Sequence, residues 1–374
     1  MPEKSSQQFP SVAFLWPALA AEATSEFASA LAHEFAALAV GPPTGSDAIE
    51  PQWTTPHTVA LEFASVRLRD FSTAPDGVPT LICAPYALHG ATVVDFAPGH
   101  SLVAALRAAG LRRLFVTDWR SAAPDMRFLS IDSYLADLNV LVDELGGEVD
   151  LVGLCQGGWL ALIYAARFPA KVRKLVLAGA PIDNAAAGSG LSELARNTPM
   201  SLFQELVDIG NGRMLGQHIL KFWAPYAFDR QGIHRLLQPA DALDSPAFRQ
   251  LENSFRDWNA WTLDLPGTYY LQVVEQLFKE NRLATGRFAA LGRQIDLAEV
   301  RCTLFLLAAR DDELVAPAQI FATERLVGSA PGNIRQLTAP GGHLGLFMGR
   351  GNLSELWPEI ARWLAGDDRA RNAA

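Results

Sequence analysis

The residues with the clearest chemical potential form the run Gly153-Leu154-Cys155-Gln156-Gly157. A short apolar run over 149–152 precedes it, and a helical pattern over 159–166 follows it. A strand, a sharp turn and a helix are the setting of a G-x-S-x-G nucleophile elbow, with Cys155 where serine is usual. We expect Gly153 and Gly157 to allow the tight turn that holds the thiol exposed in a strained conformation. A thiol there predicts a covalent acyl-enzyme formed from a thioester or ester. The plainer interpretation is a small buried cysteine before an ordinary helix.

Two later segments carry the side chains that such a nucleophile needs. A strand-like run over 302–308 leads into Asp311 and Asp312, and the next, over 333–337, leads to His343. Nucleophile, acid and histidine in this order, with acid and histidine just past successive strands, is typical of α/β-hydrolases. We expect His343 to take the thiol proton and Asp312 to orient the imidazole, with Asp311 as the alternative acid. The competing interpretation is a helix-capping Asp312 and a loop histidine bonded to backbone.

The oxyanion formed in acyl transfer needs preorganised hydrogen-bond donors, each worth roughly 3 kcal/mol. One is expected to be the backbone N–H of Gln156, directly after the nucleophile. The other is expected from Leu88, in the loop after a strand at 80–84. His89, beside it, is either a substrate contact or a structural loop histidine. Trp159 and Trp258 complete the candidate substrate-binding residues.

Strand-like and helix-like segments alternate along most of the chain. Strands are expected at 58–70, 80–84, 114–117, 149–152, 172–177, 302–308 and 333–337, and helices at 102–109, 131–145 and 353–364. Asn352 and Glu355 suit a capping arrangement at the start of the last helix. The alternation predicts a mostly parallel sheet with right-handed crossovers, as in the α/β-hydrolase fold.

Residues 184–285 break this alternation, since they are helical, rich in aromatic side chains and without a clear strand. We expect them to form a helical cap inserted over the C-terminal edge of the sheet, where ligands of open α/β sheets bind. Residues 46–183 and 286–374 would then form the core. Residues 1–45 form an Ala-rich helical segment and a linker. That helix either packs on its own core or presents a face to a partner subunit or a hydrophobic particle.

Composition restricts the classes of function. The chain has 374 residues, of which 49% are hydrophobic, which suits one large α/β domain with an insertion. A net charge of −9 without a long basic run disfavours nucleic-acid binding. Three cysteines far apart in sequence fit a reducing cytoplasm rather than a disulfide framework. We expect no signal peptide, no transmembrane segment, no metal site and no cofactor.

Further motifs extend the pattern around Cys155 over most of the chain. They are Thr117-Asp118-Trp119, Ala180-Pro181-Ile182-Asp183, Trp258-Asn259, Leu265-Pro266-Gly267, Glu280-Asn281-Arg282-Leu283, Val315-Ala316-Pro317 and Gly341-Gly342-His343-Leu344-Gly345. With Gly153 to Gly158 they make residues from about 58 to 365 resemble the polyhydroxyalkanoate synthases, most closely the short, class III/IV-like catalytic subunits of the two-component enzymes.

The resemblance implies a Cys–Asp–His triad at Cys155, Asp312 and His343. It implies a 3-hydroxyacyl-CoA thioester as substrate, with coenzyme A as leaving group, and a growing polyester chain as acceptor. It also implies a cytoplasmic location at the surface of polymer granules. It leaves open whether a second synthase subunit or a homodimer is required.

Some positions depart from the synthase pattern. Trp159 replaces a small residue, Trp261 stands where long synthases have aspartate, and His89 replaces an asparagine. Several motifs also resemble intracellular polyhydroxyalkanoate depolymerases, which hydrolyse stored polymer with a cysteine triad. Those relatives usually carry proline where this chain has Gly157 and Gly158. A synthase-like acyltransferase is therefore the leading hypothesis, a depolymerase or thioesterase the alternative, and a non-catalytic granule protein a third.

Overall fold

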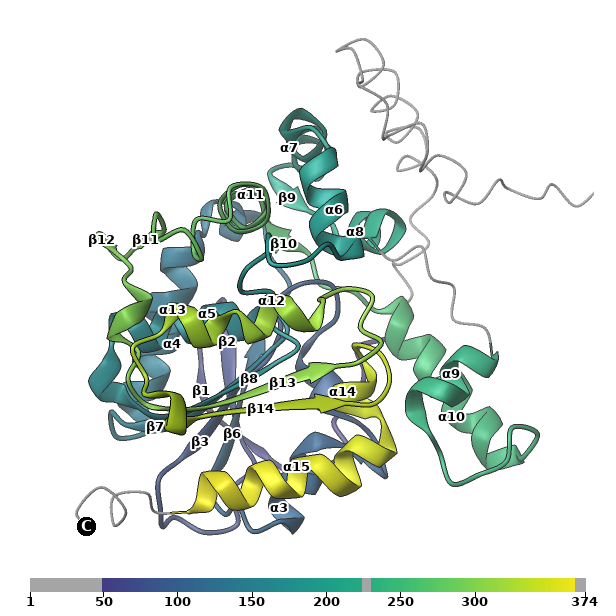
Figure 1. The fold of residues 1–374 in the computed structure, drawn as a ribbon. Coiled ribbons are helices and arrows are strands. Elements are labelled where there is room, and N and C mark those ends of the chain that lie inside the picture. The colour runs from purple at the N-terminus through teal and green to yellow at the C-terminus, as the bar shows by residue number, and fades with distance from the viewer. Residues whose placement is uncertain (1–48, 224–229, 367–374) are drawn as a thin grey trace, which may run out of the picture.

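The computed structural model describes residues 49–223 and 230–366, so the helix predicted near the N-terminus lies outside the described residues. An eight-stranded sheet with the order β1-β2-β6-β3-β7-β8-β13-β14 forms its centre. Helices α3 and α15 cover one face of this sheet, and α4, α5, α12 and α13 cover the other (Figure 1). Within these residues no helix is both long enough and apolar enough to cross a membrane.

The sheet strands lie close to the segments expected from the sequence. They are β1 (Thr58–Glu62), β2 (Val66–Asp70), β3 (Thr80–Cys83), β6 (Leu114–Trp119), β7 (Val149–Leu154), β8 (Val172–Ala178), β13 (Thr303–Ala309) and β14 (Ile334–Ala339). All pairs from β6 to β14 are parallel, and β2 is antiparallel to both β1 and β6. The predicted mostly parallel sheet is confirmed. The single strand expected over 58–70 is a hairpin, because Phe63 N–H bonds the Val66 carbonyl and turns the chain.

The helices on the sheet faces are α3 (Leu102–Ala108), α4 (Ile131–Glu144), α5 (Gln156–Arg167), α12 (Pro317–Phe321), α13 (Thr323–Leu326), α14 (Gly345–Met348) and α15 (Arg350–Ala365). Ser101 caps α3, and Ser130 caps α4. The expected cap at the start of α15 is wrong. This helix begins at Arg350, and the amide of Asn352 instead donates to the Pro340 and Gly345 carbonyls.

Between the paired strands β8 and β13 the chain makes a long excursion. It contains α6 (Gly190–Asn197), α7 (Met200–Ile209), α8 (Gly216–Trp223), α9 (Arg230–Leu237), α10 (Pro246–Ala260), α11 (Gly267–Gln272) and a π-helix (Val273–Lys279). Figure 1 shows α9 and α10 side by side, beyond the carboxyl ends of β13 and β14. The excursion also holds strands β9 (Arg213–Met214) and β10 (Leu265–Pro266), which the sequence did not predict. Two residues are too few for an alternating pattern.

Two further short strand pairs lie outside the main sheet among the described residues. They are β4 (Asp95–Ala97) with β5 (His100–Ser101), and β11 (Ala289–Ala290) with β12 (Arg293–Gln294). The first pair lies between β3 and α3, where the Asp95 carboxylate accepts bonds from Thr54, Thr55 and Ser101. This carboxylate therefore ties the start of the described chain to the core.

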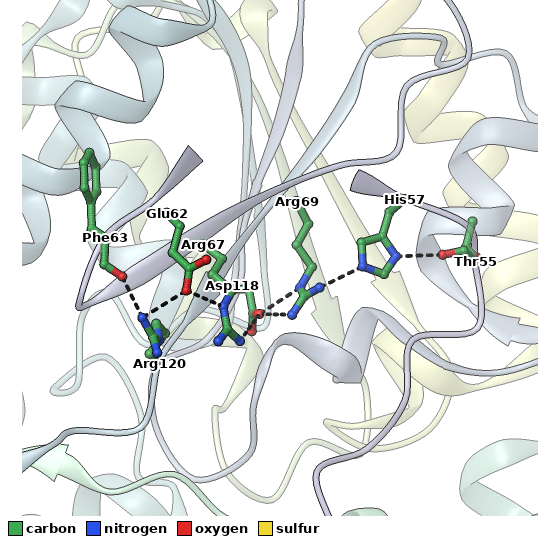
Figure 2. A network of polar contacts seen from close by, with 8 residues as sticks. All are labelled: Thr55, His57, Glu62, Phe63, Arg67, Arg69, Asp118 and Arg120. Carbon is green, nitrogen blue, oxygen red and sulfur yellow. Dashed lines mark hydrogen bonds and ion pairs between the residues drawn. The ribbon is translucent and has the colours of Figure 1, made fainter. Parts of the chain in front are cut away.

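A chain of charged side chains joins β1 and β2 to β6 (Figure 2). The Arg69 guanidinium lies 2.6 Å from the Asp118 carboxylate, 2.7 Å from the His57 ring and 4.7 Å from the centre of the Trp53 ring. Burial raises the pKa of Asp118, although Arg69 acts in the opposite direction. The other charged members are Glu62, Arg67 and Arg120. Asp118 of the Thr-Asp-Trp motif therefore forms an ion pair with Arg69 that links β6 to β2.

We predict that Asp118→Ala lowers the free energy of unfolding by about 3–5 kcal/mol, because it leaves the Arg69 charge unpaired in buried surroundings. The side chains of Arg69 and Asp118 are only 11% and 12% exposed. The measurement is urea denaturation. Asp76→Ala is the control, since its pair with Arg112 is exposed and should contribute less than about 1 kcal/mol. Equal losses in the two variants would contradict the prediction.

Candidate active site

Cys155, Asp312 and His343 lie at one edge of the sheet. Cys155 follows β7, Asp312 follows β13 and His343 follows β14. Because these strands are parallel, their carboxyl ends share an edge, so residues far apart in the sequence come together. Cys155 and His343 line a cavity of about 640 Å³ with mainly apolar walls. The structure thus brings together all three residues predicted for the triad.

Cys155 has an unusual backbone conformation, with φ 50° and ψ −121°. Such values strain a residue that has a side chain, and this strain is typical of functional sites. The Cys155 N–H donates to the Ala178 carbonyl of β8 at 2.8 Å, and the Cys155 carbonyl accepts from the Gly158 N–H at 2.9 Å. These bonds hold the residue between the end of β7 and the first turn of α5.

The glycines around Cys155 have a different function from the one expected. None has a positive φ, so the strain of the turn falls on the cysteine itself. A Cβ on Gly157 would lie 2.2 Å from the Cys83 carbonyl oxygen, and one on Gly158 would lie 2.3 Å from Ala180 Cβ. Both positions require glycine because the start of α5 packs directly against the Cys83 backbone and against Ala180.

His343 and Asp312 form a buried pair. The His343 Nδ1 lies 2.8 Å from one Asp312 carboxylate oxygen, and the other oxygen accepts the N–H groups of Leu314 and Val315 at 2.9 Å each. Asp311 bonds Gly341 through its backbone N–H and faces the cavity. The geometry therefore favours Asp312 over Asp311 as the acid.

The electrostatics of His343 follow from its neighbours. Burial acts to lower the pKa of His343, but the charges of Asp312 and Cys155 and the hydrogen bond to Asp312 outweigh it. The pKa of His343 is therefore raised well above its ordinary value. The Nε2 atom is buried and makes no well-formed hydrogen bond with the described residues, although Cys155 is near enough to act on the ring. This arrangement favours a protonated imidazole beside the sulfur.

The loop that carries His343 is fixed from two sides. The Asn352 amide bonds carbonyls on either side of it in the sequence, at Pro340 and Gly345. Gly179, with φ 58°, passes so close that an added Cβ would lie 3.1 Å from the His343 ring. Both positioning residues were missed from the sequence, because Asn352 reads as a helix start and Gly179 as an ordinary glycine after a strand.

The predicted oxyanion donors Gln156 and Leu88 both line the cavity. Gln156 is the first residue of α5, and Leu88 lies in the loop after β3, where its carbonyl accepts from Leu263 N–H. The two expected elements therefore meet next to Cys155. The role of their backbone N–H groups remains a prediction.

Of the predicted substrate contacts, His89 and Trp258 line the cavity and Trp159 does not. The His89 ring lies 4.1 Å from that of Trp258 and donates from Nδ1 to the Trp261 carbonyl. Burial lowers the pKa of His89 to about 4 despite this bond, so its ring is neutral at physiological pH. Trp159 is completely buried and packs near Tyr269 beneath the cavity.

Comparison with known proteins finds similarity to poly(3-hydroxyalkanoate) polymerase subunits and to one family model. It is 28% identical over 78% of its length to the poly(3-hydroxyalkanoate) polymerase subunit PhaC of Allochromatium vinosum, of which 82% is covered. It is 29% identical over 85% of its length to the corresponding subunit of Synechocystis, of which 86% is covered. Residues 243–368 match a family model described as the C-terminus of PHB de-polymerase.

Among solved structures, the monoacylglycerol lipase of Paleococcus ferrophilus superposes with a TM-score of 0.50. The match covers 80% of this chain and 98% of the lipase at 16% identity, so it bears on the fold alone. Together with the strand order, it identifies the α/β-hydrolase fold that the sequence predicted.

We predict that protonated His343 stabilises the fold most below its unfolded pKa of about 6.5. The folded pKa is raised, so this contribution is fully present at low pH and is lost as the pH rises through the folded value. The Asp312→Asn variant removes the carboxylate charge, which is the main reason that the pKa of His343 is raised. The difference in free energy of unfolding between wild type and Asp312→Asn should therefore shrink from about pH 6 upward. Denaturation across this range measures it, with His343→Gln as control. A difference that grows with pH would refute the assignment.

Proposed function

The chain is a polyhydroxyalkanoate synthase-like protein with the α/β-hydrolase fold, and we propose that it transfers 3-hydroxyacyl groups from CoA thioesters to a growing polyester. The observation that carries this proposal is the buried His343–Asp312 pair beside Cys155 at an apolar cavity. A thiol fits the reaction because exchange between two thioesters is nearly balanced, so the acyl group stays reactive on the enzyme.

In the first half-reaction, the Cys155 sulfur, whose proton is held on His343 Nε2, bonds the thioester carbonyl carbon. The carbonyl electron pair moves to oxygen, and the resulting oxyanion accepts hydrogen bonds from the N–H groups of Gln156 and Leu88. When the intermediate collapses, the bond between carbon and the CoA sulfur breaks. The CoA thiolate takes the proton from His343 and leaves.

In the second half-reaction, a hydroxyl group of the chain or of the next monomer gives its proton to His343. Its oxygen attacks the acyl carbon, and the Cys155 thiolate leaves. The hydrogen bond from His343 Nδ1 to Asp312 stabilises the imidazolium in both halves. The net result is one new ester bond.

Residues 184–285 are proposed to act as the cap of this site. Their aromatic and apolar side chains form much of the cavity wall, including Ile219, Trp258, Tyr269, Tyr270 and Phe278. A mainly apolar wall disfavours water beside the acyl-enzyme, so a polymer hydroxyl can compete for it. We further propose that the protein works at polymer granules in the cytoplasm, with a second synthase subunit or a second copy as partner.

A second candidate function is hydrolysis of stored polyester or of thioesters by the same triad. The match of residues 243–368 to the depolymerase family model favours it. The triad is common to both reactions, so only the product distinguishes them. The test is to incubate the full-length protein with 3-hydroxybutyryl-CoA, follow free CoA with a thiol reagent and identify the acyl product. Insoluble polyester supports the synthase, whereas free 3-hydroxybutyrate alone overturns it in favour of a hydrolase.

We predict that Cys155→Ala abolishes CoA release and that Asp312→Asn lowers its rate by about 10⁴-fold, since the imidazole loses its orienting carboxylate. Asp311→Asn is the matched control, because the Asp311 side chain does not bond His343, and its rate should change little. Initial rates of CoA release measure all three. A larger loss in Asp311→Asn than in Asp312→Asn would show that the acid is misassigned.

A further inference from the structure

Tyr269 is a buried aromatic residue at the start of α11 that none of the preceding steps uses. It lines the cavity together with Cys155 and is 1% exposed. The hydroxyl groups of the neighbouring tyrosines are bonded, with Tyr134 donating to Tyr86 and Tyr86 donating to the Arg120 carbonyl. Unlike those of Tyr134 and Tyr86, the Tyr269 hydroxyl forms no hydrogen bond found among the described residues. A donor at the cavity wall is therefore left for a ligand.

The aromatic rings around Tyr269 fix its place. Its ring centre lies 5.3 Å from that of Tyr86, 4.9 Å from Tyr134 and 6.2 Å from Trp159. Tyr86 belongs to the loop after β3, and Trp159 belongs to the first turn of α5. Tyr269 thus packs against the two elements that carry the proposed oxyanion donors.

The sheet order shows on which side of the nucleophile this residue lies. Strand β7, which ends in Cys155, stands between β3 on one side and β8, β13 and β14 on the other. His343 follows β14, whereas the ring neighbours of Tyr269 include the loop after β3. Tyr269 therefore packs on the β3 side of the nucleophile strand, whereas His343 comes from the β14 side.

We propose that the Tyr269 hydroxyl is a third hydrogen-bond donor to the oxyanion formed when Cys155 attacks the acyl carbon, an inference that rests on the proposed function. The phenol keeps its proton throughout and donates only a hydrogen bond, while the proton that leaves Cys155 travels through His343. Burial, with smaller contributions from Tyr134, Cys83 and Cys155, raises the pKa of Tyr269 well above its ordinary value. A neutral donor is what an oxyanion requires.

The test is Tyr269→Phe in the full-length protein, which keeps the ring and removes only the hydroxyl. The rate of CoA release from 3-hydroxybutyryl-CoA should fall about 100-fold with little change in KM, as for loss of one oxyanion donor. Tyr134→Phe is the matched control, since it removes a hydroxyl from the same cluster that bonds Tyr86. This control should retain the wild-type rate. A wild-type rate in Tyr269→Phe would overturn the proposal.

The rate at which iodoacetamide alkylates Cys155 distinguishes an oxyanion donor from two alternatives. In the first, the Tyr269 hydroxyl donates a hydrogen bond to the Cys155 sulfur, and in the second, Tyr269→Phe changes the packing around Cys155. Alkylation forms no oxyanion, so its rate should be the same in wild type and Tyr269→Phe. A parallel loss of alkylation and of CoA release would overturn the proposal, because Tyr269 would then act on the thiolate.

Failure of the proposed function would be seen separately, as absence of CoA release by the wild type. The same variants would then be compared on p-nitrophenyl butyrate, whose cleavage passes through an equivalent oxyanion. A loss confined to Tyr269→Phe would still support the donor role, and equal rates would reject it.

Discussion

The strained backbone at Cys155 is the constraint on which the rest of the site depends. A φ of 50° at a residue with a side chain costs about 1–3 kcal/mol, and it persists only where the surroundings impose it. Here α5 lies against the backbone after β3 and against Ala180, at distances that leave no room for a Cβ on Gly157 or Gly158. The close packing of the helix thus forces the turn, and the turn lifts the sulfur into the cavity.

That packing also determines what surrounds the sulfur. With α5 packed against the backbone at the end of β3, both Gln156 and Leu88 line the same cavity as Cys155. The parallel register of β8, β13 and β14 then delivers His343 to the other side of Cys155. In the proposed mechanism, donors for negative charge on oxygen and a base for the thiol proton would lie on different sides of Cys155, as addition to a carbonyl requires. The charged residues of the network on β1, β2 and β6 do not line the cavity, so we assign their contribution to stability.

The sheet, and the meeting of Cys155, Asp312 and His343 at one edge of it, could be predicted from the sequence because both depend on local patterns. Apolar runs ending in glycine or acidic turns mark the strand ends, and the chain order of Cys155, Asp312 and His343 follows from them. Features that depend on packing between distant segments could not be read in this way. The sequence suggested that Trp159 contacts substrate, yet its place beneath the cavity depends on how α11 covers α5. Asn352 looked like a helix cap, but its partners are carbonyls in the loop before the helix.

The apolar cavity explains why the same triad does not by itself decide between polymerisation and hydrolysis. His343 can deprotonate water as readily as a polymer hydroxyl, so the outcome depends on which oxygen reaches the acyl carbon. The cavity wall, to which residues 184–285 contribute, is mainly apolar, and the ring of His89, which lines it from the loop after β3, is neutral. A hydroxyl carried on an apolar polyester chain gains from burial in such a wall, whereas water loses hydrogen bonds there. Under the proposed function, the lining of the cavity rather than the triad would therefore select the acceptor.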